Sequence, residues 1–142
     1  MIESYHLRFI QQLGRSYRAF IAGFEAHTGH SMARWRILVL LDARKEMSQK
    51  ALALELGVDP AALTRQLKAL ELVGWVERHS DPQDARLTNA VLTEAGRQTV
   101  LASIERRNEY IEGALGHLSE DELGHLSDML VTLEERLLAN RS

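Results

Sequence analysis

Residues 48–74, with the sequence SQKALALELGVDPAALTRQLKALELVG, constrain the fold of this chain more than any other stretch. Ser48 is a favourable helix N-cap, and Gly57 stands where a left-handed residue commonly ends a helix. Asp59 then provides a second N-cap, and Pro60 occupies the first helical position, where a backbone N–H is not needed. Two short helices joined by a glycine turn predict a helix-turn-helix.

A polar hairpin follows this pair of helices. The segments WVERH and RLTNAVL predict two strands, and the loop SDPQDA between them contains the turn residues Asp81 and Pro82. Thr93 then has the character of an N-cap for the next helix. The sequence therefore predicts a helix-turn-helix followed by a two-stranded wing.

Apolar residues recur at spacings of three and four near both ends of the chain, from Ile10 to Phe24 and from Leu101 to Leu137. Neither end can bury such a stripe alone, so we expect the terminal helices to pack together across a two-fold axis in a homodimer. Packing within one chain is the alternative. The expected fold class is mainly α with a small β-wing.

Composition limits the remaining classes. The chain has 142 residues and no cysteine, which excludes disulfides and thiolate zinc sites. Its longest aliphatic run, Ile37–Leu41, is too short to span a bilayer, and no N-terminal signal segment is evident, so we expect a cytoplasmic protein. No phosphate loop or catalytic triad motif occurs, so neither an enzyme nor a cofactor is expected.

The second helix of the predicted pair has two distinct faces. On a helical wheel its buried face consists of Leu63, Leu67 and Leu70. Ala61, Arg65 and Lys68 lie opposite, with Thr64 on the flank. Small residues near the N-terminus of a helix, followed by hydrogen-bond donors, suit a recognition helix in the major groove. The alternative is an ordinary solvated face.

The wing provides a second argument. Asp84 and Arg86 are two residues apart at its tip, so both side chains can point the same way. A carboxylate can hold the guanidinium in a fixed orientation, and Arg86 could then enter the minor groove. The alternative is a surface ion pair without a partner. The expected DNA contacts are Ser48, Gln49, Ala61, Thr64, Arg65, Lys68, Asp84 and Arg86.

Net charge alone gives a mild argument against a nucleic-acid partner, because the formal value is -3. Between residues 60 and 97 the acidic and basic residues are equal in number. Binding would therefore depend on a few well-placed cations and on the helix N-terminal amides at Ser48 and Asp59, and we expect a moderate salt dependence.

Residues 48–97 resemble the winged helix-turn-helix of the MarR/SlyA family of bacterial transcription regulators. Asp81, Asp84 and Arg86 match the family's D-x-R-D-x-R wing signature, and Leu92, Thr93 and Gly96 match its L-T-x-x-G. Gln83 stands where the family commonly has a basic residue, and Ala90 where it usually has a larger aliphatic one. The wing tip is thus less cationic than is typical.

The resemblance extends over the whole chain and implies a single MarR-like domain at residues 1–142. Its winged helix-turn-helix would occupy residues from about 31 to 97, between dimerisation helices at about 1–30 and 98–142. The resemblance also implies a dimeric repressor that binds a pseudo-palindromic double-stranded DNA operator and is released by a small ligand. Its half-sites would lie about 10–11 base pairs apart.

A ligand pocket between the first, second and fifth helices is a further implication of the resemblance. Four residues could meet an anionic aromatic ligand there: His6, Tyr17, Arg18 and Trp35. The alternative places Trp35 and Tyr17 in the core and Arg18 in solvent. His27 and His30 have a metal-compatible spacing, but no acidic or cysteine companion, so we prefer a solvated loop to a metal site.

A second function class remains open. The same architecture could serve as a dimeric winged-helix module that binds protein rather than DNA. An apolar exposed face would favour that function, and Leu72 points outward on the helical wheel. The polar character of Arg65, Lys68 and Arg86 favours DNA.

Overall fold

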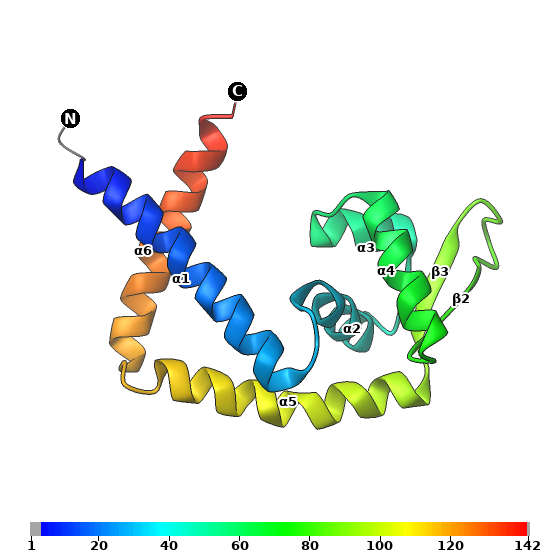
Figure 1. Cartoon of the computed structure of the whole chain (residues 1–142). Coiled ribbons are helices and arrows are strands. Elements are labelled where there is room, and N and C mark those ends of the chain that lie inside the picture. The colour runs from blue at the N-terminus through cyan, green and yellow to red at the C-terminus, as the bar shows by residue number, and fades with distance from the viewer. Residues whose placement is uncertain (1–3, 142) are drawn as a thin grey trace. The chain divides into compact units, whose positions relative to one another are not determined.

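The computed structural model describes residues 4–141, which form two compact units that divide between Asn108 and Glu109 (Figure 1). The first unit contains, in chain order, α1 (Tyr5–Thr28), α2 (Met32–Arg44), β1 (Glu46–Ser48), α3 (Gln49–Leu56), α4 (Pro60–Leu72), β2 (Val76–Ser80), β3 (Thr88–Leu92) and most of α5 (Glu94–Leu115). The second contains the end of α5 and α6 (Glu120–Ala139). A mainly helical fold with a small β-wing is thereby confirmed.

The predicted helix caps of the helix-turn-helix are present. The Ser48 hydroxyl accepts a hydrogen bond from the Ala51 amide at 3.1 Å, and the Asp59 carboxylate accepts one from Ala62 at 3.0 Å. Gly57 ends α3 at φ 66°, a left-handed conformation that other residues adopt only with strain. These local contacts set where α3 ends and where α4 begins.

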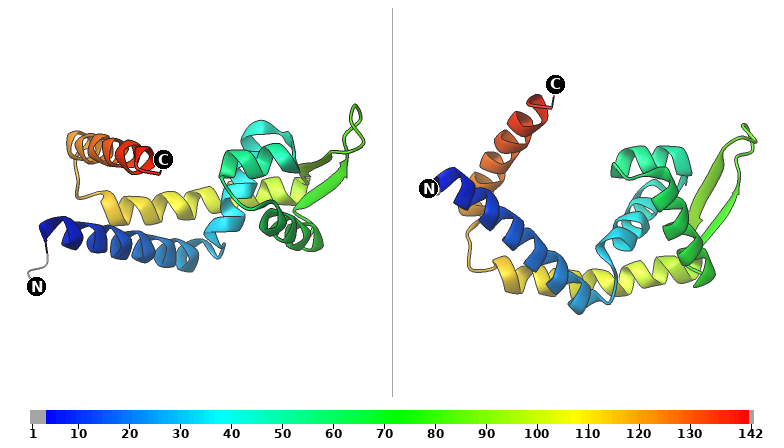
Figure 2. Two further views of the ribbon diagram at one scale, coloured as in Figure 1. Left: turned by 90° about the horizontal axis from the view of Figure 1, so that it is seen from above. Right: turned by 45° about the horizontal axis from the view of Figure 1, so that its top comes forward.

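The sheet has three strands rather than the two predicted. The strands are antiparallel in the order β1-β3-β2. Ala90 on the central strand β3 lies opposite Met47 of β1 on one side and opposite Arg78 of β2 on the other. The additional strand β1 covers the second edge of β3 at the base of the wing. Figure 2 shows β2 and β3 extending beyond the helices of the first unit as a narrow ribbon.

The core of the first unit lies where α2, α3 and α4 meet the sheet. Its fully buried leucines are Leu38, Leu41, Leu52, Leu67 and Leu70, each 0% exposed. The stripe along α1 is buried only near its end, at Phe24, whereas Tyr17 is 64% exposed. In α6 no described residue is buried. Among residues 4–141, no helix is long and apolar enough to cross a membrane.

Candidate DNA-binding surface

Helix α4 presents a polar face to solvent. Leu63, Leu67 and Leu70 are buried, as the sequence predicted. The expected contacts Ala61, Arg65 and Lys68 are all exposed, and Thr64 is half-buried beside them. One side of α4 is thus fixed by the core, and the opposite side leaves two cations free to reach a partner.

Gln49 and Thr64 connect α3 to α4. The Gln49 side-chain amide donates to the Thr64 hydroxyl at 3.2 Å, and that hydroxyl donates to the Pro60 carbonyl at 3.0 Å. The structure therefore brings these two expected DNA contacts together. Ser48 precedes them as the cap of α3, with its hydroxyl engaged by the Ala51 amide.

Asp84 and Arg86 form the ion pair expected at the wing tip. The guanidinium donates from Nε to Oδ1 at 3.0 Å and from Nη2 to Oδ2 at 3.1 Å, and the Arg86 amide also donates to Oδ1. These bonds lower the pKa of Asp84 and raise that of Arg86. The Arg86 side chain is nevertheless 90% exposed, so its orientation is fixed while it remains accessible.

Asp81 organises the wing loop from within. Its Oδ1 accepts the backbone amides of Gln83 and Asp84 at 2.8 and 2.9 Å, and its Oδ2 accepts the Asn89 side-chain amide at 2.9 Å. These hydrogen bonds lower the pKa of Asp81, with the largest effect from Asn89 and smaller effects from the two backbone amides. The loop that presents Arg86 therefore depends on a carboxylate at its base.

Arg78 was not among the residues singled out for DNA binding, yet it joins the wing to both helices. It donates to the Glu71 carboxylate through Nε and Nη2, at 3.3 and 2.9 Å, and to the Gln49 side-chain carbonyl at 3.4 Å. The alternation of β2 could have indicated this, because Arg78 shares a strand face with buried Val76. Its partners lie on other elements and could not be read from the sequence.

The four expected ligand residues are not grouped in one pocket. Trp35 is buried, packs 6.0 Å from the Phe24 ring and 5.7 Å from the His30 ring, and lines a pocket of about 350 Å³ together with Arg36, Val39, Leu40, Ala43, Glu55 and Leu56. His6, Tyr17 and Arg18 are exposed on α1 and do not line it. His6 stacks on Tyr5 instead, with ring centroids 4.0 Å apart.

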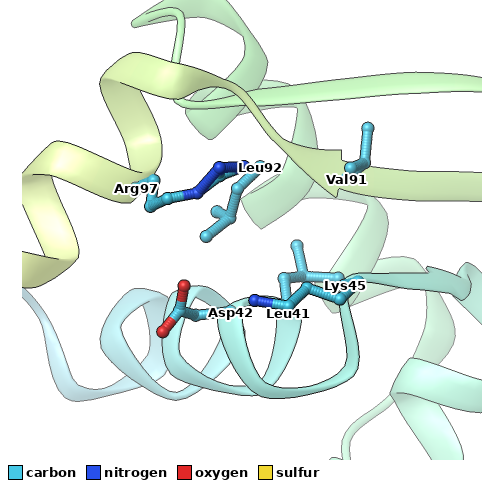
Figure 3. A pocket seen from close by; sticks show the side chains of 6 residues that line it. All are labelled: Leu41, Asp42, Lys45, Val91, Leu92 and Arg97. Carbon is cyan, nitrogen blue, oxygen red and sulfur yellow. The ribbon is translucent and has the colours of Figure 1, made fainter.

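A second pocket lies between α2 and the junction of β3 with α5. Figure 3 shows its lining: Leu41, Asp42, Lys45, Val91, Leu92 and Arg97. Its volume is about 70 Å³, well below the ~150 Å³ of a cavity that holds benzene. It is therefore too small for an aromatic ligand.

His27 and His30 do not act together. The His30 Nε2 lies 2.8 Å from the Ser103 hydroxyl, whereas the His27 Nδ1 lies 3.2 Å from the Gly23 carbonyl. Burial, followed by the nearby Arg106, lowers the pKa of His30. Residues 4–141 contain no group of three or more His, Cys, Asp or Glu side chains that could hold a metal ion.

Comparison with known proteins identifies the family. The MarR family model matches residues 31–88, from the N-cap of α2 to the start of β3. YdgJ of Bacillus subtilis, an uncharacterized HTH-type transcriptional regulator, is 36% identical over 114 residues, which cover 80% of this chain and 70% of YdgJ.

Two complexes are among the solved structures that share the fold. A MarR mutant from E. coli complexed with operator DNA matches with a TM-score of 0.83 at 21% identity, covering 92% of this chain and 99% of that one. PcaV from Streptomyces coelicolor, in complex with its natural ligand, matches with a TM-score of 0.85 at 18% identity, covering 95% and 97%. The relatives of this chain are regulators rather than enzymes. The chain itself belongs to the MarR family of DNA-binding, helix-turn-helix transcriptional regulators.

Proposed function

We propose that this protein is a dimeric, sequence-specific repressor that acts in the bacterial cytoplasm and is released from its operator by a small ligand. The observation that carries the DNA-binding part is the pairing of two accessible basic elements. Arg65 and Lys68 are exposed on α4, and Arg86 is held outward by Asp84 at the wing tip. We assign α4 to the major groove and Arg86 to the adjacent minor groove.

The dimer is supported by apolar surface that the described chain leaves uncovered. Large apolar side chains are exposed on α1, among them Tyr5, Leu7, Phe9, Ile10 and Tyr17. Helix α6 likewise exposes Leu126, Met129, Leu130, Val131, Leu137 and Leu138. Large apolar side chains exposed together along a helix mark interaction sites, and a second copy would bury them while duplicating the recognition helix. The operator would then be pseudo-palindromic, with half-sites one DNA turn apart.

The effector part of the proposal rests on the pocket beside Trp35. Its volume of about 350 Å³ suits a small aromatic molecule, and Arg36 could meet an anionic group. PcaV, which shares the fold, was solved with its natural ligand. His6, Tyr17 and Arg18 remain candidate contacts that a dimer partner could complete.

Selection of bound duplexes from a random pool, followed by gel-shift titration, tests the DNA-binding part. Arg86→Ala should weaken operator binding and leave the elution volume of the dimer unchanged. Arg65→Ala should lose about 1–3 kcal/mol of binding free energy and relax the preference at one base pair if the side chain reads a base. Failure to enrich any sequence would contradict the proposal.

A protein-binding module is the second candidate, because Leu72 is 89% exposed at the end of α4 and Val73 follows it at 53%. Such a module would enrich no duplex. Leu72→Ala separates the two functions, since it should leave operator affinity unchanged if α4 binds DNA through its polar face.

A further inference from the structure

We propose that Arg78 is a positioning residue that sets the angle between the wing and the recognition helix, and through that angle the sequence preference of binding. The inference rests on the DNA-binding function proposed above. Arg78 comes from β2, while its partners Glu71 and Gln49 belong to α4 and α3. One side chain thus ties together the three elements that would have to fit the operator simultaneously.

The geometry of the guanidinium supports this role. Two of its nitrogens bind the two oxygens of Glu71, and the third lies 3.4 Å from the Gln49 carbonyl. A planar fork can hold two partners at fixed angles, which a lysine ammonium cannot do. The Arg78 side chain is only 19% exposed, so little of it is available to a phosphate.

The hydrogen bond from Arg78 also determines which atoms of Gln49 and Thr64 donate and which accept. The side-chain carbonyl of Gln49 faces the Arg78 guanidinium, so the amide nitrogen of Gln49 points to Thr64. If the Gln49 amide were reversed, its NH2 group would face the guanidinium, and two hydrogen-bond donors would be placed against each other. The Thr64 hydroxyl then accepts from Gln49 and donates to Pro60. Gln49 and Thr64 therefore support the start of α4, and Arg65 and Lys68 remain the groups free to contact DNA.

The same network explains why the helix proposed to face DNA carries an acidic residue. A carboxylate near phosphate should weaken binding, yet Glu71 lies at the end of the polar face of α4. Its charge is paired with Arg78, whose hydrogen bonds lower the pKa of Glu71. Glu71 thereby serves as the anchor for Arg78 on α4.

The test compares Arg78→Lys, Arg78→Gln and Glu71→Gln by fluorescence anisotropy, on the selected operator and on a scrambled duplex across a range of salt. We expect each variant to lower the ratio of operator to scrambled affinity by about tenfold, with the dependence of affinity on salt unchanged. The double variant Arg78→Lys/Glu71→Gln should lower the ratio of operator to scrambled affinity no further than either single variant does. Arg44→Gln is the matched control, because it breaks another Arg–Glu pair, with Glu55, and should keep the wild-type ratio.

Three results would overturn the proposal. In the first, Arg78→Gln weakens both duplexes equally and reduces the salt slope by about one while Arg78→Lys behaves as wild type, which marks a phosphate contact. In the second, Glu71→Gln strengthens binding to both duplexes equally, which marks simple repulsion. In the third, all variants keep the wild-type ratio. Wild-type protein that binds neither duplex would instead refute the proposed function, and melting curves identify any variant that has lost its fold.

Discussion

A single methyl group added at Gly96 should displace the start of α5 from the start of β2. Gly96 lies in the first turn of α5, and a Cβ added there would be 2.1 Å from the Trp75 carbonyl oxygen. Real Cβ atoms essentially never approach another heavy atom within 3.0 Å, so the helix or the start of β2 must move by about 1 Å. The obstacle is backbone, which cannot rotate away.

The expected loss of stability follows from that displacement. Overpacking against a rigid group costs about 1–3 kcal/mol. The movement also strains two hydrogen bonds made by Thr93, from its amide to the Trp75 carbonyl at 3.0 Å and from its hydroxyl to the Gly74 carbonyl at 2.6 Å. Each contributes about 1 kcal/mol. We expect Gly96→Ala to lower the free energy of unfolding by about 4 kcal/mol, and the melting temperature by about 13 °C.

Gly113→Ala provides the matched control on the same helix. Nothing lies within 4 Å of a Cβ at Gly113, so alanine there should stabilise α5 by about 0.5–1 kcal/mol. Urea denaturation at one fixed protein concentration measures both variants, because dimerisation makes stability depend on concentration. A Gly96→Ala midpoint equal to that of the wild type would refute the reasoning.

Further predictions address the core, the pH dependence and the wing tip. Leu67→Ala should cost about 2.7–5 kcal/mol of unfolding free energy, because the side chain is 0% exposed, whereas exposed Leu72→Ala should change it by less than about 0.5 kcal/mol in the same urea titration. The Ser80 carbonyl, followed by Glu46, raises the pKa of His79 above 6.5, so its contribution to stability is complete below pH 6.5 and is lost as pH rises through the raised pKa. The stability difference between wild type and His79→Gln should therefore shrink as pH rises from 6 through the raised pKa of His79; a constant difference would argue against this. Half-buried His30 should act in the opposite sense, since its lowered pKa makes the fold lose stability as pH falls below 6.5. Asp84→Asn should weaken operator binding in a gel shift although it removes a negative charge, and tighter binding would show that the carboxylate acts only by repulsion.

The sequence predicted features that depend on neighbouring residues. The caps at Ser48 and Asp59 involve amides three residues away, and the Asp84–Arg86 pair spans two residues. Strand β1 escaped prediction because three residues carry no alternation signal, and its pairing with β3 joins positions more than 40 residues apart, as in Ser48 with Asn89. Such pairing depends on the assembled fold rather than on local propensity.

The site was predictable to a similar extent. Helical periodicity placed Arg65 and Lys68 on the exposed face of α4, since the position of its leucines fixed that face. It could not place Arg78 against Glu71 and Gln49, because these contacts join a strand to two helices. Tyr17 follows His6 by eleven residues on one helix, a rise of about 16 Å, which explains why the two do not share a pocket.

The hydrogen bonding of the wing loop has a thermodynamic consequence. Asp81 and Asp84 accept hydrogen bonds from four backbone amides within the loop itself, those of Gln83, Asp84, Arg86 and Leu87. Its conformation is thus held by contacts that need no DNA, and ordering it on the duplex should lose little entropy. Calorimetry would register this as a mild entropic penalty on association, and the loop would dock on DNA as a rigid body.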